Sequence, residues 1–178
     1  LGPNEETTKF VEVLISAASK PLVIDADGLR PFMGNHNLFE EITVPFVITP
    51  HYGEFCRLTA ADSKTIEGEF TSVVTDFMND FSGILVAKNA PSCVFYKNDG
   101  IVNSTGNPAL ATAGTGDVLT GMIAGFIAQG LEPSNAAQTA VYIHGKAADL
   151  FCDKKGMRGM IASDLLNTIP TVLADYDD

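Results

Sequence analysis

Short apolar runs that alternate with helical patterns are the feature that most restricts the fold of this chain. Three runs are typical of short buried strands, at residues 21–25, 45–48 and 83–87. Helical patterns separate and follow them, at residues 7–19, 53–59, 65–81, 115–130, 134–152 and 161–175. The turn sequence Asn98-Asp99-Gly100 predicts a hairpin between residues 93–96 and 101–102. The alternation of strands and helices predicts an α/β fold with a largely parallel sheet.

Polar side chains stand at the end of each predicted strand. Asp25 and Asp27 follow the first strand, His51 follows the second and Lys88 follows the third. Because ligands in open α/β sheets bind at the carboxyl ends of the strands, we expect these residues to gather at a site. The two aspartates offer oxygen ligands to Mg²⁺ or its waters. A capped turn at a strand end explains the same two residues equally well.

A glycine-rich turn before an apolar helix is the segment that indicates chemistry most directly. Gly114, Thr115 and Gly116 precede Asp117 at the start of the 115–130 pattern. Glycines and a helix start present free N–H groups to an anion, and a nearby carboxylate can act as a base. This equipment suits phosphoryl transfer to a hydroxyl. The same residue types also form ordinary helix starts, and the run matches neither a Walker A loop nor GxGxxG.

Composition narrows the class of protein. The chain has 178 residues, and we expect residues 1–178 to form a single domain. A formal net charge of −11 argues against a nucleic acid as partner. The sequence shows no membrane-spanning apolar run and no signal peptide. The three cysteines form no CxxC, so we expect neither a disulfide framework nor a zinc site, and we expect a cytoplasmic location.

Six motifs stand out along the chain, namely VIDADGL (23–29), ITPHYGEFCRL (48–58), LVAKNAPSCVF (85–95), NSTGNPALATAGTGDVLTG (103–121), AVYIHGKAADL (140–150) and GMIASDLLNTIP (159–170). Together they resemble the motifs of the ADP/ATP-dependent NAD(P)H-hydrate dehydratases of the ribokinase-like superfamily. The resemblance implies a three-layer α/β/α fold. It also implies a repair reaction in which ADP or ATP, with Mg²⁺, phosphorylates the hydroxyl of hydrated NADH or NADPH (NADHX or NADPHX), and phosphate is then eliminated.

The resemblance also assigns roles to residues. Asp117 would be the catalytic base, and the preceding turn would form the anion hole. The adenine nucleotide would contact Lys88, Asn89, Ala90, Pro91, Ser92, Gly114, Thr115 and Gly116. The hydrated dinucleotide would contact Gly2, His51, Asn107 and Asp117. For His51 a helix-capping or core role is the alternative. His144 and Lys146 are interpreted as packing or surface residues, and no residue is predicted to be a dedicated metal ligand.

Two departures from the family pattern qualify these assignments. Asn89 replaces a glycine after the third strand, and because asparagine tolerates left-handed backbone we expect the turn to survive. The family's domain also carries about a hundred further residues upstream. We therefore expect this chain to be the C-terminal portion of a longer domain. The resemblance further implies a homo-oligomer, often a tetramer, and in some members a fused epimerase domain.

Two other functions remain open from the sequence. A vitamin-precursor kinase of the same superfamily would also place its base in a glycine-rich turn, although the TPHxGE segment would then be unexplained. A non-catalytic nucleotide-binding module would explain an incomplete domain. The sequence does not decide between ADP and ATP as the phosphoryl donor.

Overall fold

The computed structural model describes residue 2 and residues 4–176. Its internal contacts divide the chain into two compact units. Unit 1 comprises Leu1–Asn89 and Cys93–Ile101, and unit 2 comprises Ala90–Ser92 and Val102–Asp178. The single domain expected from the sequence stays a prediction.

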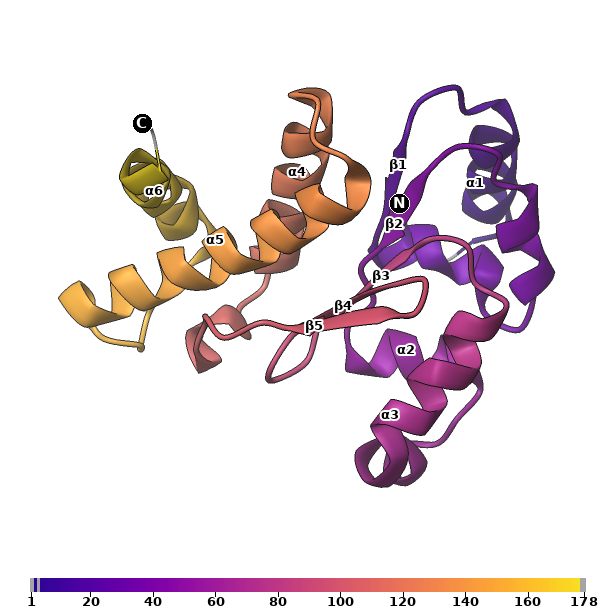
Figure 1. Ribbon diagram of the computed structural model, residues 1–178, viewed down its shortest axis with the longest axis horizontal. Coiled ribbons are helices and arrows are strands. Elements are labelled where there is room, and N and C mark those ends of the chain that lie inside the picture. Colours follow the sequence, from indigo (N-terminus) through magenta and orange to yellow (C-terminus); the bar gives the residue numbers. More distant parts are fainter. Residues whose placement is uncertain (1, 3, 177–178) are drawn as a thin grey trace. The chain divides into compact units, whose positions relative to one another are not determined.

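A five-stranded sheet of mixed direction organises unit 1 (Figure 1). The strands are β1 (Leu22–Ile24), β2 (Phe46–Ile48), β3 (Ile84–Ala87), β4 (Cys93–Tyr96) and β5 (Asp99–Val102). They lie in sequence order, with β1, β2 and β3 parallel and β4 antiparallel to β3. Leu22 pairs with Phe46, and Val47 pairs with Ile84. The predicted α/β class with a largely parallel sheet is therefore confirmed.

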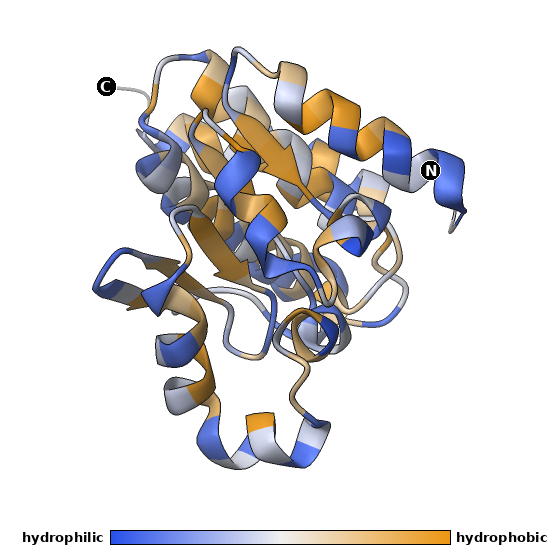
Figure 2. Ribbon diagram, turned by 90° about the vertical axis from the view of Figure 1, so that its right-hand side faces the viewer, coloured by the Kyte–Doolittle hydropathy of each residue, from blue (hydrophilic) through white to orange (hydrophobic). Residues whose placement is uncertain are grey.

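The parallel strands of unit 1 consist of apolar residues, and β2 and β3 are more deeply buried than β1. Every residue of β2 and β3 is buried. The strands accordingly stand out in Figure 2 as uniformly hydrophobic, whereas the helices mix hydrophobic and hydrophilic residues. Gly83 directly precedes β3, and a Cβ at this position would lie 2.4 Å from the Phe46 ring. The absence of a side chain at Gly83 therefore leaves room for the buried Phe46 ring.

Among the described residues of unit 1, three α-helices and two 3₁₀-helices accompany the sheet. The α-helices are α1 (Glu5–Ala17), α2 (Tyr52–Thr59) and α3 (Ser63–Asn79), and the 3₁₀-helices are η1 (Ala26–Phe32) and η2 (His36–Glu41). Polar caps explain where the α-helices begin, since Asn4 accepts a hydrogen bond from the Thr7 N–H and Asp62 accepts one from the Thr65 N–H. The two 3₁₀-helices were not predicted.

An aromatic cluster fills the core of unit 1. Phe32 and Phe39 stack with ring centroids 4.1 Å apart, and Phe81 meets Phe39 edge-on at 5.0 Å. Phe77 lies 4.9 Å from Phe81, and all four rings are buried. Burying one such side chain contributes about 1.5–3 kcal/mol, so this cluster is a main source of stability for unit 1.

Helices make up most of unit 2. They are η3 (Pro108–Leu110), α4 (Thr115–Ala128), α5 (Pro133–Lys155), α6 (Ala162–Leu173) and η4 (Ala174–Tyr176). The long helix α5 packs against both α4 and α6. Small side chains on α5, such as Ala147 and Ala148, are fully buried and let the neighbouring helices approach closely. Leu165 and Val172 of α6 complete this core.

The observed elements differ from the sequence expectations mainly in the hairpin. The turn between β4 and β5 consists of Lys97 and Asn98, so the turn predicted around residues 98–100 was placed too late. Lys97 adopts a positive φ of 53°, and Gly100 lies within β5. A Cβ on Gly100 would lie 2.8 Å from the Phe95 ring, so this glycine provides space rather than a turn. Within the described residues, no helix is long and apolar enough to cross a membrane.

Candidate functional site

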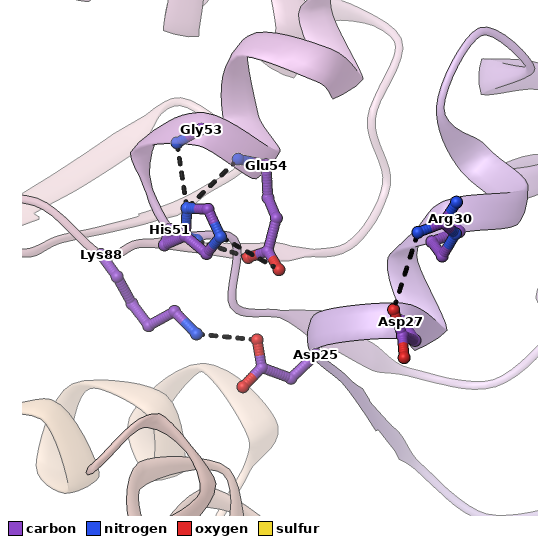
Figure 3. Close-up of polar contacts among 7 residues, drawn as sticks. All are labelled: Asp25, Asp27, Arg30, His51, Gly53, Glu54 and Lys88. Atoms are coloured by element: carbon purple, nitrogen blue, oxygen red, sulfur yellow. Dashed lines mark hydrogen bonds and ion pairs between the residues drawn. The ribbon is translucent and has the colours of Figure 1, made fainter. Parts of the chain in front are cut away.

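The ends of the parallel strands in unit 1 carry the polar residues predicted there (Figure 3). Lys88, directly after β3, places its Nζ 2.7 Å from Oδ1 of Asp25, which follows β1. The Lys88 side chain is 21% exposed and the Asp25 side chain 10% exposed. The ammonium group has three N–H donors and, among the described residues, one hydrogen-bond acceptor. Lys88 can therefore still donate to a phosphate while it remains paired with Asp25.

His51 caps helix α2. Its Nδ1 accepts hydrogen bonds from the N–H groups of Gly53 at 3.0 Å and Glu54 at 3.3 Å. In return, the Glu54 carboxylate accepts a hydrogen bond from the backbone N–H of His51 at 2.8 Å, which completes a capping box. Because Nδ1 acts as an acceptor, the ring proton is assigned to Nε2. The alternative capping role is thus present, and its 55% exposed side chain leaves the predicted dinucleotide contact open.

Asp27 is engaged by the start of the chain. Its Oδ2 accepts the Gly2 N–H at 2.8 Å, and its Oδ1 lies 3.8 Å from Nη1 of Arg30. Gly2 adopts a φ of 92°, a conformation that favours glycine. The predicted contact of Gly2 with the damaged cofactor stays a prediction.

The carboxylates considered for Mg²⁺ are therefore held by protein groups. Asp25 is paired with Lys88, and Asp27 accepts the Gly2 N–H. Among the described residues, no group of three or more His, Cys, Asp or Glu side chains could hold a metal ion. Within the described part of the chain, these residues therefore do not fit a resident metal site.

The segment predicted to line the nucleotide follows Lys88. The Lys88 N–H donates to the Pro50 carbonyl at 2.9 Å, and Lys88 forms a parallel bridge with His51. The Ala90–Pro91 peptide bond is cis, and the Ser92 carbonyl accepts the Asn103 N–H at 2.9 Å. Asn89 does not adopt a positive φ, so the turn forms without the left-handed conformation considered for this residue.

The glycine-rich turn of unit 2 begins helix α4. Gly114 occupies the cap position with a φ of 85°, and a Cβ there would lie 3.1 Å from the Ala162 Cβ. The Thr115 hydroxyl lies 2.7 Å from the Leu110 carbonyl and 2.8 Å from the Thr112 carbonyl. The Thr115 N–H donates to the Thr112 carbonyl at 3.3 Å. Thr115 is thus buried, its hydroxyl is bound to the preceding loop, and its backbone N–H already donates a hydrogen bond.

The two residues that follow Thr115 keep free backbone N–H donors within the described part of the chain. The N–H groups of Gly116 and Asp117 find no acceptor among the described residues, as expected at the start of a helix. Two adjacent N–H groups at the positive end of a helix are suited to bind an anion. Within the described part of unit 2, the free donors thus lie at Gly116 and Asp117, and the anion hole predicted at Gly114, Thr115 and Gly116 stays a prediction.

Asp117 is the third residue of α4, and its side chain is exposed. Within the described part of the chain, its carboxylate has no hydrogen-bond or ion-pair partner. A carboxylate that is not used for capping or for an ion pair is available as a proton acceptor. This availability, directly beside free N–H donors, is what the predicted base requires.

Asn107 is held inside unit 2. Its Nδ2 donates to Oδ1 of Asp149 at 2.9 Å, while its Oδ1 accepts from the Ala109 N–H at 3.1 Å and the Cys152 thiol at 3.3 Å. The second Asp149 oxygen accepts the Gly106 N–H at 2.9 Å. These contacts give Asn107 a clear role in shaping the loop, and its predicted substrate contact stays a prediction.

Sequence reasoning missed two residues of α5 that hold these loops. Asp149 binds Gly106 and Asn107, and the buried imidazole of His144 lies 2.9 Å through Nε2 from the Thr115 carbonyl. The interpretation of His144 as a packing residue was incomplete, because its ring also hydrogen-bonds the turn. The available signal in the sequence was a polar residue, His144, among small and apolar residues on one face of the predicted helix.

Comparison with known proteins finds relatives along the whole chain. The bifunctional NAD(P)H-hydrate repair enzyme Nnr of Moorella thermoacetica is 35% identical over 179 residues, which cover 100% of this chain and 34% of the relative. A structure of the ADP/ATP-dependent NAD(P)H-hydrate dehydratase from Bacillus subtilis, co-crystallized with ATP/Mg²⁺, matches with a TM-score of 0.89 and 29% identity. The match covers 99% of this chain and 62% of that one.

A hydroxyethylthiazole kinase from Pyrococcus horikoshii matches with a TM-score of 0.62 and 16% identity, over 99% of this chain and 80% of that one, which shows a common fold. The sequence profile of NAD(P)H-hydrate dehydratase matches residues 1–171. The resemblance drawn from the six motifs is thereby confirmed, and the chain belongs to the NAD(P)H-hydrate dehydratase family.

Proposed function

We propose that this protein takes part in the ADP- or ATP-dependent dehydration of hydrated NADH and NADPH. The relatives named for this reaction support the proposal, although the chain spans 34% of the Moorella relative and 62% of the Bacillus structure. The observation that carries it is Asp117, an exposed carboxylate without a partner among the described residues, beside the free N–H groups that begin α4.

Each step of the chemistry follows from these groups. The Asp117 carboxylate takes the proton of the ring hydroxyl, whose oxygen then attacks the terminal phosphoryl group of the nucleotide. The Gly116 and Asp117 N–H groups stabilise the negative charge that develops on the phosphoryl oxygens. Phosphate then leaves the ring carbon and takes up a proton lost from the adjacent ring carbon, so that the ring double bond forms between these two carbons, and the nucleotide is released one phosphate shorter.

Lys88 supplies positive charge for the adenine nucleotide in this proposal. Its remaining N–H donors can contact phosphate oxygens without breaking the 2.7 Å pair with Asp25. Mg²⁺, with which the Bacillus structure was co-crystallized, would reach the site on the phosphates of the nucleotide, as it commonly does. Residues 88–92, His51, Gly2 and Asn107 are proposed to complete the nucleotide and dinucleotide contacts.

The proposal extends to partners and location. A homo-oligomer, often a tetramer, follows from the family resemblance, and the bifunctional Moorella relative supports a fused second activity such as an epimerase. Three free cysteines fit a reducing compartment such as the cytoplasm.

The test is recovery of reduced-nicotinamide absorbance from chemically prepared NADH hydrate. Protein, Mg²⁺ and either ADP or ATP are mixed with the hydrate, and Asp117→Asn is compared with the wild type. We expect the variant to lose turnover by orders of magnitude with little change in nucleotide affinity, as for a group that acts in the transition state. Asp153→Asn, which removes an exposed carboxylate on α5, is the matched control and keeps full activity.

The assay also separates the competing functions. The nucleotide that restores absorbance identifies the phosphoryl donor. A stable phosphorylated product without restored absorbance would indicate a small-molecule kinase. Nucleotide binding without any turnover, in both the 178-residue chain and a longer polypeptide that contains it, would indicate a binding module and would refute the proposal.

A further inference from the structure

His144 lies in the middle of α5, and its side chain faces the start of α4. It is only 6% exposed, and its Nε2 lies 2.9 Å from the Thr115 carbonyl oxygen. A carbonyl oxygen can only accept, so Nε2 carries a proton and donates it. A buried imidazole therefore reaches from one helix to the backbone at the first residue of another.

The position of this hydrogen bond matters because of the peptide unit that it fixes. The Thr115 carbonyl and the Gly116 N–H belong to the same planar peptide group, in which the two bonds point in opposite directions. Holding the carbonyl toward His144 therefore points the Gly116 N–H away from α5. That N–H is one of the two donors that remain without an acceptor among the described residues.

Two attachments prevent this peptide unit from turning. The Thr115 hydroxyl holds the residue to the preceding loop through the Leu110 and Thr112 carbonyls, at 2.7 and 2.8 Å. The imidazole holds the carbonyl to α5. A hydrogen bond accepted by a carbonyl also polarises the N–H of the same peptide group, which strengthens it as a donor.

We infer that His144 is a positioning residue, which aims the Gly116 N–H and the neighbouring Asp117 carboxylate at the transferred phosphoryl group. The inference rests on the function proposed above for Asp117. It assigns His144 no contact with substrate, and it requires the ring to act only through the Thr115 carbonyl.

A matched pair of variants tests the hydrogen bond. The amide nitrogen of glutamine can take the place of Nε2, so His144→Gln keeps a donor at that position. His144→Met is similar in length and has no donor, and both variants lose the second ring nitrogen equally. We expect His144→Met to lower kcat on the order of 10²-fold, the effect of a small misplacement of reacting groups, with KM for both substrates nearly unchanged. His144→Gln recovers most of the loss.

Equal kcat values for the two variants, or a loss confined to KM, would overturn the inference. Thermal denaturation of both variants shows whether they fold. If His144→Met does not fold, His144→Asn takes its place, because its amide reaches only to the position of Nδ1 and leaves the Thr115 carbonyl without a donor. A role limited to packing lowers the melting temperature and leaves kcat of the folded variant unchanged, which also contradicts the inference.

A second measurement does not depend on turnover. The amide ¹⁵N shift of Gly116 responds to hydrogen bonding at the preceding carbonyl, so it moves in His144→Met and stays near the wild-type value in His144→Gln. If the wild type shows no turnover but this shift moves, the proposed function fails and the hydrogen bond stands. If the shift is the same in all three proteins, the positioning role is refuted, whatever the turnover.

Discussion

Gly145 of α5 lies where the loop of residues 103–107 crosses the helix, and replacing it by alanine tests that crossing. A Cβ at Gly145 would lie 2.3 Å from the Thr105 Oγ1, 2.7 Å from its carbonyl carbon and 2.8 Å from its carbonyl oxygen. The two backbone distances fall well below the 3.4 Å at which ordinary contact begins. A change of side-chain rotamer relieves the first clash but not the other two.

The loop has little freedom to move away from the added methyl group. The Thr105 hydroxyl lies 2.8 Å from the Tyr142 carbonyl, and the Asn103 Nδ2 donates to the Thr105 carbonyl at 2.8 Å. Inserting a methyl group into such a contact costs about 1–3 kcal/mol. Alanine gains about 1 kcal/mol over glycine in a helix. We expect Gly145→Ala to lower the free energy of unfolding by up to about 2 kcal/mol.

Gly125→Ala in α4 is the matched control, because a Cβ there meets no atom within 4 Å. It should raise the free energy of unfolding by about 1 kcal/mol through helix propensity alone. Urea unfolding followed by circular dichroism gives both values, and the difference between the variants isolates the steric term at about 1–3 kcal/mol. If the two variants have the same free energy of unfolding, the close contact between Gly145 and the backbone of Thr105 is refuted.

Two further predictions concern titratable groups. Asp62 caps α3, and the hydrogen bond from the Thr65 N–H holds the pKa of this carboxyl below its ordinary 3.8. Its stabilising contribution is therefore complete above the ordinary pKa and is lost as the pH falls through the folded pKa, which lies lower. Asp62→Asn should therefore flatten the acid dependence of Tm below about pH 4. Burial raises the pKa of the Cys93 thiol. Iodoacetamide should therefore label Cys93 more slowly at pH 8 than it labels the half-buried Cys56 and Cys152, and peptide mass spectrometry measures the three rates. Equal labelling rates would contradict the burial of Cys93.

The sequence predicted those parts of the site that depend on local patterns. Apolar runs placed the parallel strands, and the polar residues after them do pair, as Asp25 and Lys88 show. The start of α4 near residue 115 was also predicted, because a glycine-rich turn followed by an acidic residue and an apolar run is a local signature of a helix start. In these cases the information lies within a few residues of the element that it defines.

Contacts between distant segments were beyond a single sequence. Asp149 and Gly106 are 43 residues apart, and His144 and Thr115 are 29 residues apart. Nothing in the local pattern of a helix states which loop its polar residues will hold. Gly100 shows the same limit, since its small size serves the Phe95 ring on the adjacent strand rather than the turn that its neighbours indicate.

Helix α5 emerges as the frame on which the loops of unit 2 are built. It supplies His144 to the Thr115 carbonyl, Gly145 to the crossing of Thr105, and Asp149 to Gly106 and Asn107. None of these α5 residues needs to touch a substrate in order to matter. Because a rigid helix holds both the turn that carries Asp117 and the loop that carries Asn107, a change on α5 alters the two together. Substitutions at positions 144, 145 and 149 should therefore resemble defects of the site itself, whereas those on the exposed face of the same helix, such as Asp153→Asn, should be neutral.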